Sequence, residues 1–275
     1  MNKVLLQKTA SLIRQDVVVM LGEAGSGHSA GSLGMADIFV SLYFQLLHHK
    51  SLNPWWNDRD RLLVSNGHIC PVWYATLARA GYFEKNKIYT LRQIDSNLQG
   101  HPQFRSVPGV ENTSGPLGQG VSLSIGVALA AKLKRQTWKT ICITSDGEQQ
   151  EGQVWEAYMA AKKFSLDNLI FIMDRNHIQI GGDTENIMPL ESLREKLKAF
   201  GLFVLEIDGH DFEQIEDAYY KAMTIKKQAT MIIAHTIPGK GVRFMEGDYK
   251  WHGKTPNKEE TEKALRELDN NKVLF

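Results

Sequence analysis

The sequence predicts an α/β fold in which helices cover both faces of a parallel sheet. Five short runs rich in β-branched residues lie along the chain, and several are apolar at successive positions, as strands buried on both faces are. Longer segments with apolar residues at helical spacing separate most of these runs, and such alternation implies right-handed crossovers. The 275 residues, 43% of them hydrophobic and 23% charged, suffice for the core of such a domain.

The predicted elements follow one another along the chain. The first 18 residues interleave Lys and Arg with apolar residues at helical spacing, which predicts a helix. No unbroken apolar stretch follows these charges, so we do not expect a signal peptide here. The strands expected are RLLVS (61–65), TICIT (140–144), LIFIM (169–173), FVLEI (203–207) and TMIIAH (230–235). The helices expected around them span 118–136, 151–164, 191–200 and 212–223.

We expect one domain over residues 1–275. The sequence contains no linker rich in Gly, Pro or Ser and no internal repeat. The domain would have a helical N-terminal extension and a short C-terminal tail, 256–275, that closes as a helix.

Charge and composition exclude several classes of partner. The formal net charge is +1, so no electrostatic feature indicates nucleic acid or an anionic membrane surface. No window of about 18 apolar residues occurs, so no membrane span is predicted. Cys70 and Cys142 lie in unrelated contexts, and Cys142 is expected to be a small buried side chain within a strand. A reducing cytoplasm is the simplest compartment for such a chain.

Polar residues follow two consecutive strands of the predicted sheet. Asp146 and Gly147 come shortly after TICIT, and Asn176 follows LIFIM. Ligands of parallel sheets gather beyond the carboxyl ends of the strands, so the oxygens of Asp146 and Asn176 can converge on one hard cation. A backbone carbonyl, diphosphate oxygens and a water would complete an octahedral shell for magnesium.

The same turns also suit an anion. Gly147 lets the backbone approach a ligand closely, and the helix that opens at about Glu151 offers free N–H groups to a diphosphate. However, Asp, Gly and Asn are also the favoured residues of ordinary turns. From these residues alone, ligand binding and plain turn formation both stay open.

Four of the nine histidines lie in polar turns that contain glycine. A lone His in a loop is usually solvated or a cap, but four such turns indicate a site that needs donors for phosphate and sugar hydroxyl groups. These residues are His28, His68, His101 and His252. His48, His49 and His210 have no such setting and are not assigned to the site.

A glycine-rich loop, Gly115-Pro116-Leu117-Gly118-Gln119-Gly120, precedes a predicted helix. Such a loop is weak evidence for phosphate binding, because tight packing explains it as often. Met35 and Asp37 are expected only to pack and cap the first helices.

These stretches resemble the thiamine diphosphate-dependent transketolases. Residues 145–178 resemble the thiamine diphosphate motif, which is a GDG turn, a helix and a strand that ends in an Asn-bearing turn; Ser145 stands in place of the first Gly. The pair Glu151-Gly152 is typical of the transketolase form. Further family motifs, in the family's order, are similar to the runs 25–44, 59–83, 100–103, 113–130 and 234–257, so the resemblance covers about residues 10–257.

The resemblance implies a thiamine diphosphate-binding domain of the diphosphate-binding (PP) type and a metal site. Asp146, Asn176 and the main-chain carbonyl of Ile178 would bind Mg²⁺ or another divalent cation such as Ca²⁺ or Mn²⁺. His68 and His252 would contact the cofactor diphosphate. The cofactor site would further include Gly115 through its backbone, Leu117 behind the thiazolium ring, Gly147, Glu151 and Asn176.

The resemblance also implies catalytic histidines. His28 and His101, together with His252, would face the hydroxyl and carbonyl oxygens of the donor sugar. His235, at the end of the last strand, is expected in the same pocket.

Full-length transketolases contain a second domain that this chain lacks. In the family that domain supplies a Glu that protonates the aminopyrimidine of the cofactor and arginines that bind the sugar phosphate. The resemblance therefore implies the N-terminal subunit of a two-subunit transketolase, which moves a two-carbon ketol unit from a ketose phosphate to an aldose phosphate. It would be inactive without a C-terminal partner subunit, in an assembly with two copies of each chain.

Two alternatives stay open. The chain could be half of another thiamine diphosphate enzyme, either a transketolase for a non-canonical sugar or an enzyme of the 1-deoxyxylulose-phosphate synthase type. It could also be a non-catalytic binding protein that retains the fold. Intact Asp146, Asn176, His68 and His252 argue against a decayed site.

Overall fold

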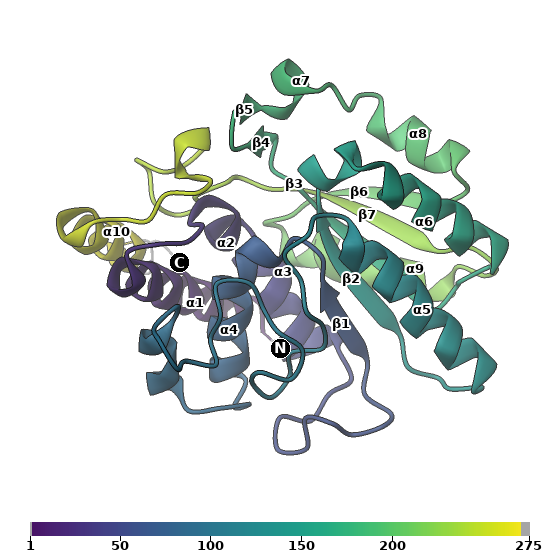
Figure 1. The fold of residues 1–275 in the computed structure, drawn as a ribbon, viewed down its shortest axis with the longest axis horizontal. Helices are drawn as coiled ribbons and strands as arrows, with labels where there is room; N and C mark the ends of the chain where they lie inside the picture. Colours follow the sequence, from purple (N-terminus) through teal and green to yellow (C-terminus); the bar gives the residue numbers. More distant parts are fainter. Residues whose placement is uncertain (1, 271–275) are drawn as a thin grey trace.

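A five-stranded parallel sheet forms the centre of the molecule in the computed structural model, which describes residues 2–270 (Figure 1). The strand order is β1-β2-β3-β7-β6. All five predicted strands are present, and their ends differ from the prediction by at most two residues. They are β1 (Arg61–Val64), β2 (Thr140–Ser145), β3 (Leu169–Arg175), β6 (Phe203–Asp208) and β7 (Thr230–His235).

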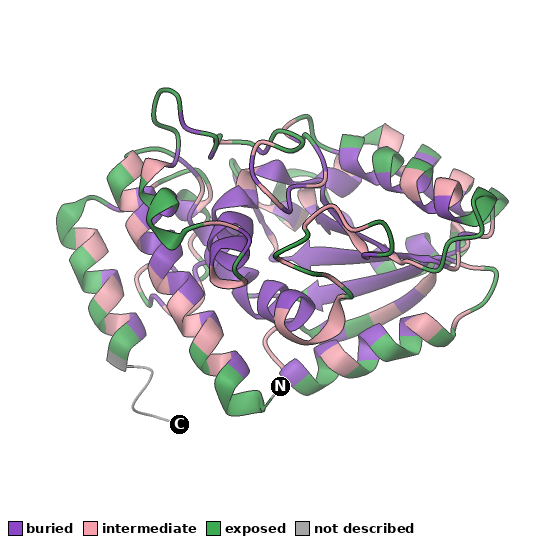
Figure 2. Ribbon diagram, turned by 90° about the horizontal axis from the view of Figure 1, so that it is seen from below, coloured by how far each residue is buried: buried purple, intermediate pink, exposed green. Residues whose placement is uncertain are grey.

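Helices cover both faces of this sheet, as the sequence predicts (Figures 1 and 2). One face is covered by α5 (Gln119–Leu133), α6 (Gly152–Lys163) and α8 (Leu193–Ala199). The other carries α1 (Lys3–Ala24), α2 (Ala30–Gly34), α3 (Ala36–Ser41), α4 (Cys70–Arg79) and α9 (Phe212–Thr224). The predicted tail helix is α10 (Lys258–Asn270), which packs along α1; residues 271–275 lie outside the described part.

Alternate strand residues enter two separate hydrophobic cores. In β3, Ile170 and Ile172 belong to the core under α1, α3, α4 and α9, whereas Phe171 and Met173 belong to the core under α5, α6 and α8. This arrangement explains why the strand is apolar at successive positions. Cys142 is buried in the second of these cores, as expected. None of the helices within residues 2–270 is long and apolar enough to cross a membrane.

The path of the chain after β3 brings polar strand ends together. A small hairpin of β4 (Ile178–Gln179) and β5 (Gly182–Asp183) follows, then α7 (Thr184–Ile187) and α8, and the chain enters the sheet at its edge as β6. Helix α9 then returns it to β7, between β3 and β6. In the resulting register Ser145 of β2 lies beside Asp174 of β3, and Arg175 lies beside His235. The carboxyl ends of β2, β3 and β7 therefore form one edge.

Candidate functional site

A cavity of about 330 Å³ lies at the carboxyl ends of β2 and β3. It is lined by turns from distant parts of the chain, including those before α2, after β1, before α5 and before α10. With the exception of His235, the structure brings together in this lining the residues that the sequence analysis assigned to the site, which are His28, His68, His101, Gly115, Leu117, Asp146, Gly147, Glu151, Asn176, Ile178 and His252.

Asp146 ties the turn after β2 to the turn after β3. It is the N-cap of the short helix Gly147–Gln150 and is almost fully buried. Its Oδ1 accepts a hydrogen bond from the main-chain N–H of Gly147 at 2.7 Å. Its Oδ2 accepts from the main-chain N–H of His177 at 2.8 Å and from Nη1 of Arg175 at 3.0 Å. The carboxylate orientation is therefore fixed by its neighbours.

Asn176 is fixed in the same way at the end of β3. Its side-chain Oδ1 accepts from the main-chain N–H of Ile178 at 3.0 Å, and its Nδ2 donates to Oδ2 of Asp174 at 2.9 Å. Asp174 is itself buried and also accepts from the hydroxyl of Thr236. The amide oxygen of Asn176 and the carboxylate of Asp146 thus line one cavity from two adjacent strand ends.

Negative charge outweighs positive charge at these strand ends. Arg175 contacts Asp146, and it also pairs with Glu185 and Glu191. Burial raises the pKa of Asp146 to about 6 even though Arg175 opposes the shift. Burial also raises the pKa of Asp174 to about 7, and the charge of Asp146 adds to this effect. A further cation at this position would compensate the buried carboxylates.

Any cation here would depend on mixed oxygen ligands. Within residues 2–270 no group of three or more His, Cys, Asp or Glu side chains is arranged to hold a metal ion. A carboxylate, an amide oxygen and a main-chain carbonyl form a set of hard oxygen donors of the kind that Mg²⁺ and Ca²⁺ prefer. The donors present at Asp146, Asn176 and Ile178 therefore fit such a cation.

Four imidazole rings gather in another part of the cavity. The ring centre of His28 lies 5.1 Å from that of His68, 6.1 Å from that of His101 and 5.6 Å from that of His252. The rings of His68 and His252 are 5.1 Å apart. Nδ1 of His28 is buried and has no hydrogen-bond partner in the described part of the chain. This atom leaves hydrogen-bonding capacity for a bound group.

The four rings are neutral at pH 7. Burial, followed by the charges of His252 and His101, lowers the pKa of His28 to about 4. Burial also lowers the pKa of His68 well below its usual value, and it lowers the pKa values of His101 and His252. Each neutral ring offers one N–H donor and one acceptor nitrogen. Such a lining suits hydroxyl and carbonyl groups as well as phosphate oxygens.

The glycine-rich loop serves both packing and the cavity. A Cβ at Gly120 would lie 2.5 Å from Cα of Ser65, so this glycine allows α5 to pack against the end of β1. Gly115 and Leu117 instead line the cavity. Tight packing therefore explains Gly120, whereas ligand binding by Gly115 and Leu117 stays a prediction.

The sequence analysis missed Glu148, a buried carboxylate that joins three turns. Its Oε1 accepts from the hydroxyl of Ser65 and from the main-chain N–H of Gly118, both at 2.6 Å. Its Oε2 accepts from the hydroxyl of Thr144 at 2.8 Å and from the main-chain N–H of Ser145 at 3.1 Å. Glu148 thus connects the ends of β1 and β2 to the glycine-rich loop. A glutamate in a polar turn gives no sequence pattern that predicts this burial.

We expect Glu148→Gln to destabilise the chain by about 2–4 kcal/mol, because an amide nitrogen would replace an oxygen that accepts from two donors. Thermal unfolding followed by circular dichroism measures the effect. Glu259→Gln, at an exposed position on α10, is the matched control and should unfold like the wild type. Equal unfolding midpoints for both variants would contradict the connecting role of Glu148.

The lining of the cavity differs from the sequence expectations at the hairpin β4–β5 and at His235. The hairpin adds Gln179, Ile180 and Gly181 to the cavity, which no sequence motif indicated. His235 is not among the residues that line it; its ring stacks on His177 at 6.0 Å and its Nε2 lies 3.1 Å from Oε2 of Glu206. The expectation for His235 was wrong because the end of β7 is one strand further from the cavity than the end of β3.

Known proteins resemble this chain over almost its full length. The profile of the family described as "Transketolase, thiamine diphosphate binding domain" matches residues 5–273. One of the subunits of the apulose-4-phosphate transketolase of Phocaeicola vulgatus is 40% identical over 255 residues, which are 93% of this chain and 90% of that protein. The 6-deoxy-6-sulfo-D-fructose transketolase subunit SqwG of a Clostridium species is 40% identical over 264 residues, or 96% of both chains.

A solved structure shares the fold. The transketolase of Campylobacter jejuni superposes with a TM-score of 0.92 at 37% sequence identity, over 98% of this chain but only 43% of that enzyme. The chain thus spans less than half the length of that single-chain transketolase, yet nearly all of relatives that are named as subunits. It belongs to the transketolase family of transferases, as its thiamine diphosphate-binding N-terminal subunit.

Proposed function

We propose that this subunit, together with a C-terminal partner subunit, transfers a two-carbon ketol unit from a ketose phosphate to an aldose phosphate. The observation that carries the proposal is a single cavity that joins the strand-end pair Asp146 and Asn176 to a cluster of neutral histidines. The strand-end pair suits a metal-bound diphosphate, and the histidine cluster suits sugar hydroxyl groups. A non-catalytic protein would have no need for both.

The metal would be Mg²⁺, or another divalent cation such as Ca²⁺ or Mn²⁺. Asp146 would bind it through its carboxylate, Asn176 through its amide oxygen and Ile178 through its main-chain carbonyl. The raised pKa of Asp146 supports this assignment, because a buried carboxylate without enough positive charge around it gains most from a bound cation.

Thiamine diphosphate, when bound, supplies a carbon nucleophile that can carry the two-carbon unit between sugars. The work of this chain is to hold and orient that group. His68, His252 and the backbone around Gly115 and Gly147 would contact the diphosphate, and Leu117 would lie behind the thiazolium ring. Glu151, the N-cap of α6, places the positive end of that helix at the cavity wall.

His28 and His101, with His252, would act on the donor sugar. Because their low pKa values keep the rings neutral, they can donate to carbonyl and hydroxyl oxygens and can accept a proton from a hydroxyl group. A cationic ring would lack the acceptor nitrogen that this second role requires.

The partner subunit would supply the Glu for the aminopyrimidine and the arginines for the sugar phosphate. Relatives that are themselves named as transketolase subunits support the existence of a partner. Exposed apolar side chains around the cavity support a covered face, since Ile180 is 77% and Leu117 is 39% exposed. We further propose a cytoplasmic heterotetramer with two copies of each chain.

Two classes of sugar are proposed as substrates. Ketose and aldose phosphates of the pentose phosphate pathway are the substrates that the family resemblance implies. The names of two relatives favour a non-canonical sugar instead, either a branched sugar phosphate or a sulfonated sugar. Comparing turnover of xylulose 5-phosphate, apulose 4-phosphate and 6-deoxy-6-sulfofructose by the reconstituted enzyme decides between them.

We expect His28→Ala and His101→Ala to raise the donor KM or lower kcat by about 100-fold, because each removes a group that acts on the sugar. Affinity for thiamine diphosphate should change only a few-fold. Steady-state kinetics and cofactor titration of the reconstituted enzyme measure the two quantities. His48→Ala, at an exposed position outside the cavity, should change neither. Loss of cofactor affinity in a folded His28→Ala chain would mean that His28 contacts the cofactor.

A further inference from the structure

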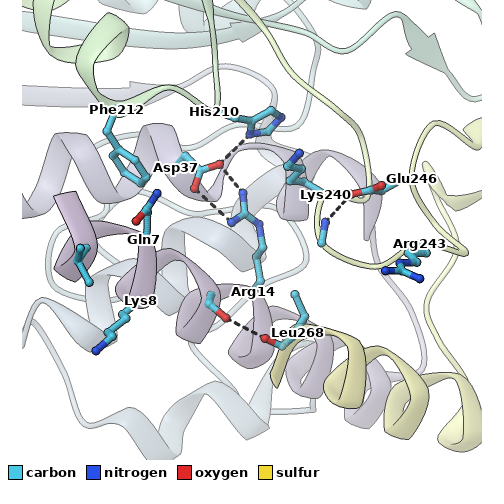
Figure 3. Close-up of a pocket in the computed structure, with 13 residues that line it drawn as sticks. Gln7, Lys8, Arg14, Asp37, His210, Phe212, Lys240, Arg243, Glu246 and Leu268 are labelled. Atoms are coloured by element: carbon cyan, nitrogen blue, oxygen red, sulfur yellow. Dashed lines mark hydrogen bonds and ion pairs between the residues drawn. The ribbon is translucent and has the colours of Figure 1, made fainter. Parts of the chain in front are cut away.

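A second cavity has a volume of about 430 Å³. Figure 3 shows the side chains that line it. It shares no lining residue with the first cavity. Its walls come from α1, from the start of α9, from the segment 240–246 and from the end of α10. Its volume lies in the range of small-molecule sites. No step of the proposed transfer reaction uses it.

One wall is a buried polar cluster whose charges are balanced. Asp37 accepts from Nη1 and Nη2 of Arg14 at 3.2 and 2.5 Å, and Nδ1 of His210 lies 2.7 Å from its Oδ2 (Figure 3). Nε2 of His210 accepts from the main-chain N–H of Ile237 at 2.8 Å, so Nδ1 carries the ring proton and donates to Asp37. Asp37 is therefore not simply a helix cap, as the sequence suggested.

The carboxylate of Asp37 is therefore ionised, and the positive charge of Arg14 balances it. Burial raises its pKa, but the charge of Arg14 and the hydrogen bonds from His210 and Arg14 outweigh that effect and hold the pKa below its usual value. The Arg14–Asp37 pair thus contributes no net charge to the cavity. An anion that enters would not meet an uncompensated carboxylate on this wall.

Three further cations that line the cavity have no side-chain partner in the described part of the chain. Lys8, Lys240 and Arg243 make no side-chain hydrogen bond or ion pair with any of residues 2–270. Within the described lining Glu246 is the acid that opposes them, and its Oε1 accepts from the main-chain N–H of Gly241 at 2.8 Å. The carboxylate of Glu267, just outside the lining, accepts from the main-chain N–H of Arg243 at 2.7 Å. Among the described residues, three positive charges against these two negative charges still leave the opening net positive.

The remaining wall is largely apolar, and Gln7 and Ser11 of α1 are its polar members. Val4 and Leu268 contribute aliphatic surface from α1 and α10, and Phe212 contributes an aromatic ring from the start of α9. A ligand that matches this cavity carries negative charge at one end and a carbon skeleton at the other. Phosphate esters have this charge at neutral pH.

We propose that this cavity binds a small phosphate ester. Arg243 offers a planar fork of donors for phosphoryl oxygens, and Lys240 and Lys8 add point charges. The carbon skeleton would pack against Phe212 and Leu268. The site is distinct from the proposed sugar site, so the proposal stands whether or not the chain catalyses ketol transfer.

The chain provides a connection from this cavity to the histidine cluster. The segment that carries Lys240 and Arg243 continues to His252, and the main-chain N–H of Gly239 donates to the carbonyl of Ala30, at the start of α2 beside His28, at 2.9 Å. The segment 239–252 thus runs from the second cavity to the wall of the first.

Isothermal titration calorimetry tests the proposal on the full chain, with thiamine diphosphate and MgCl₂ at saturating concentration so that the first cavity is occupied. Glycerol 3-phosphate is the probe, and glycerol and citrate are the comparison ligands. We expect glycerol 3-phosphate to bind, glycerol not to bind and citrate to bind more weakly. Arg243→Ala and Lys240→Ala should each weaken binding of glycerol 3-phosphate at least about tenfold.

Lys226→Ala is the matched control. Lys226 is exposed and lies beyond the far end of α9, about 20 Å of helix from Phe212, so its removal should leave the affinity unchanged. Absence of binding to the wild-type chain would overturn the proposal. Equal affinity of the wild type and the Arg243→Ala and Lys240→Ala variants would overturn it as well, because the ester would then bind elsewhere. Tighter binding of citrate would overturn the assignment to phosphate esters.

Discussion

Replacing Asp146 with Ala is expected to abolish magnesium-dependent binding of thiamine diphosphate, with a loss of affinity of about 100-fold or more. Asp146 is the one ionised group among the proposed ligands, since Asn176 and the carbonyl of Ile178 are neutral. Without it the diphosphate would meet a cavity of neutral imidazoles and no cation to bridge it to the strand ends. The far-ultraviolet circular dichroism spectrum should stay native-like.

Cofactor affinity is measured by calorimetry with excess MgCl₂ and again after addition of EDTA. Asp146→Ala also leaves Arg175 without one partner, although Arg175 keeps Thr184, Glu185 and Glu191. Asp146→Asn therefore serves as a second variant, because its amide oxygen can still accept one of the hydrogen bonds. Asp208→Ala, at the end of β6 and outside the cavity, should bind normally. Unchanged affinity in both Asp146 variants would refute the metal assignment.

The purified chain alone is expected to show no ketol transfer, whereas addition of the partner subunit should restore turnover. The chain spans only 43% of the Campylobacter enzyme, and the groups proposed for the aminopyrimidine and for the sugar phosphate lie outside it. A bound cofactor would then lack its proton partner, and the exposed Leu117 and Ile180 at the cavity rim would face water.

A coupled assay with xylulose 5-phosphate and ribose 5-phosphate, repeated with the alternative sugars, measures this dependence. Activity should rise with added partner and level off at a one-to-one ratio. Cofactor binding without turnover in the chain alone would agree with the proposal that this subunit binds the cofactor and the partner completes the active site. Robust turnover by the chain alone would show that the second subunit is not needed for catalysis.

Local sequence patterns predicted the fold class and placed Asp146 and Asn176 together, whereas Leu117 and Ile178 were assigned from the family resemblance. The apolar runs at 140–144 and 169–173 form β2 and β3 because strands buried on both faces must be apolar at successive positions. Parallel strands end at one edge of the sheet, so the residues that follow them, Asp146 and Asn176, had to lie near each other.

The features that escaped prediction depend on segments distant in the chain. Glu148 is buried because Ser65 and Gly118 reach it from two other turns, and nothing within its own turn indicates this. His235 carries a suitable side chain at a strand end, but the order β3-β7-β6 places it beside His177 and Glu206 rather than in the cavity. Strand order is a property of the whole sheet, which local patterns do not contain.

The sequence by itself therefore determined the α/β class and the strand ends, because each depends on residues adjacent in the chain. Only the tertiary structure decided which buried carboxylate ties these turns together. It alone also decided that Lys8, Lys240 and Arg243 surround a second cavity. The physical reason is that α1, α9 and α10 pack beside the segment 240–246 only in the folded chain, where burial and charge pairing select which side chains keep a partner.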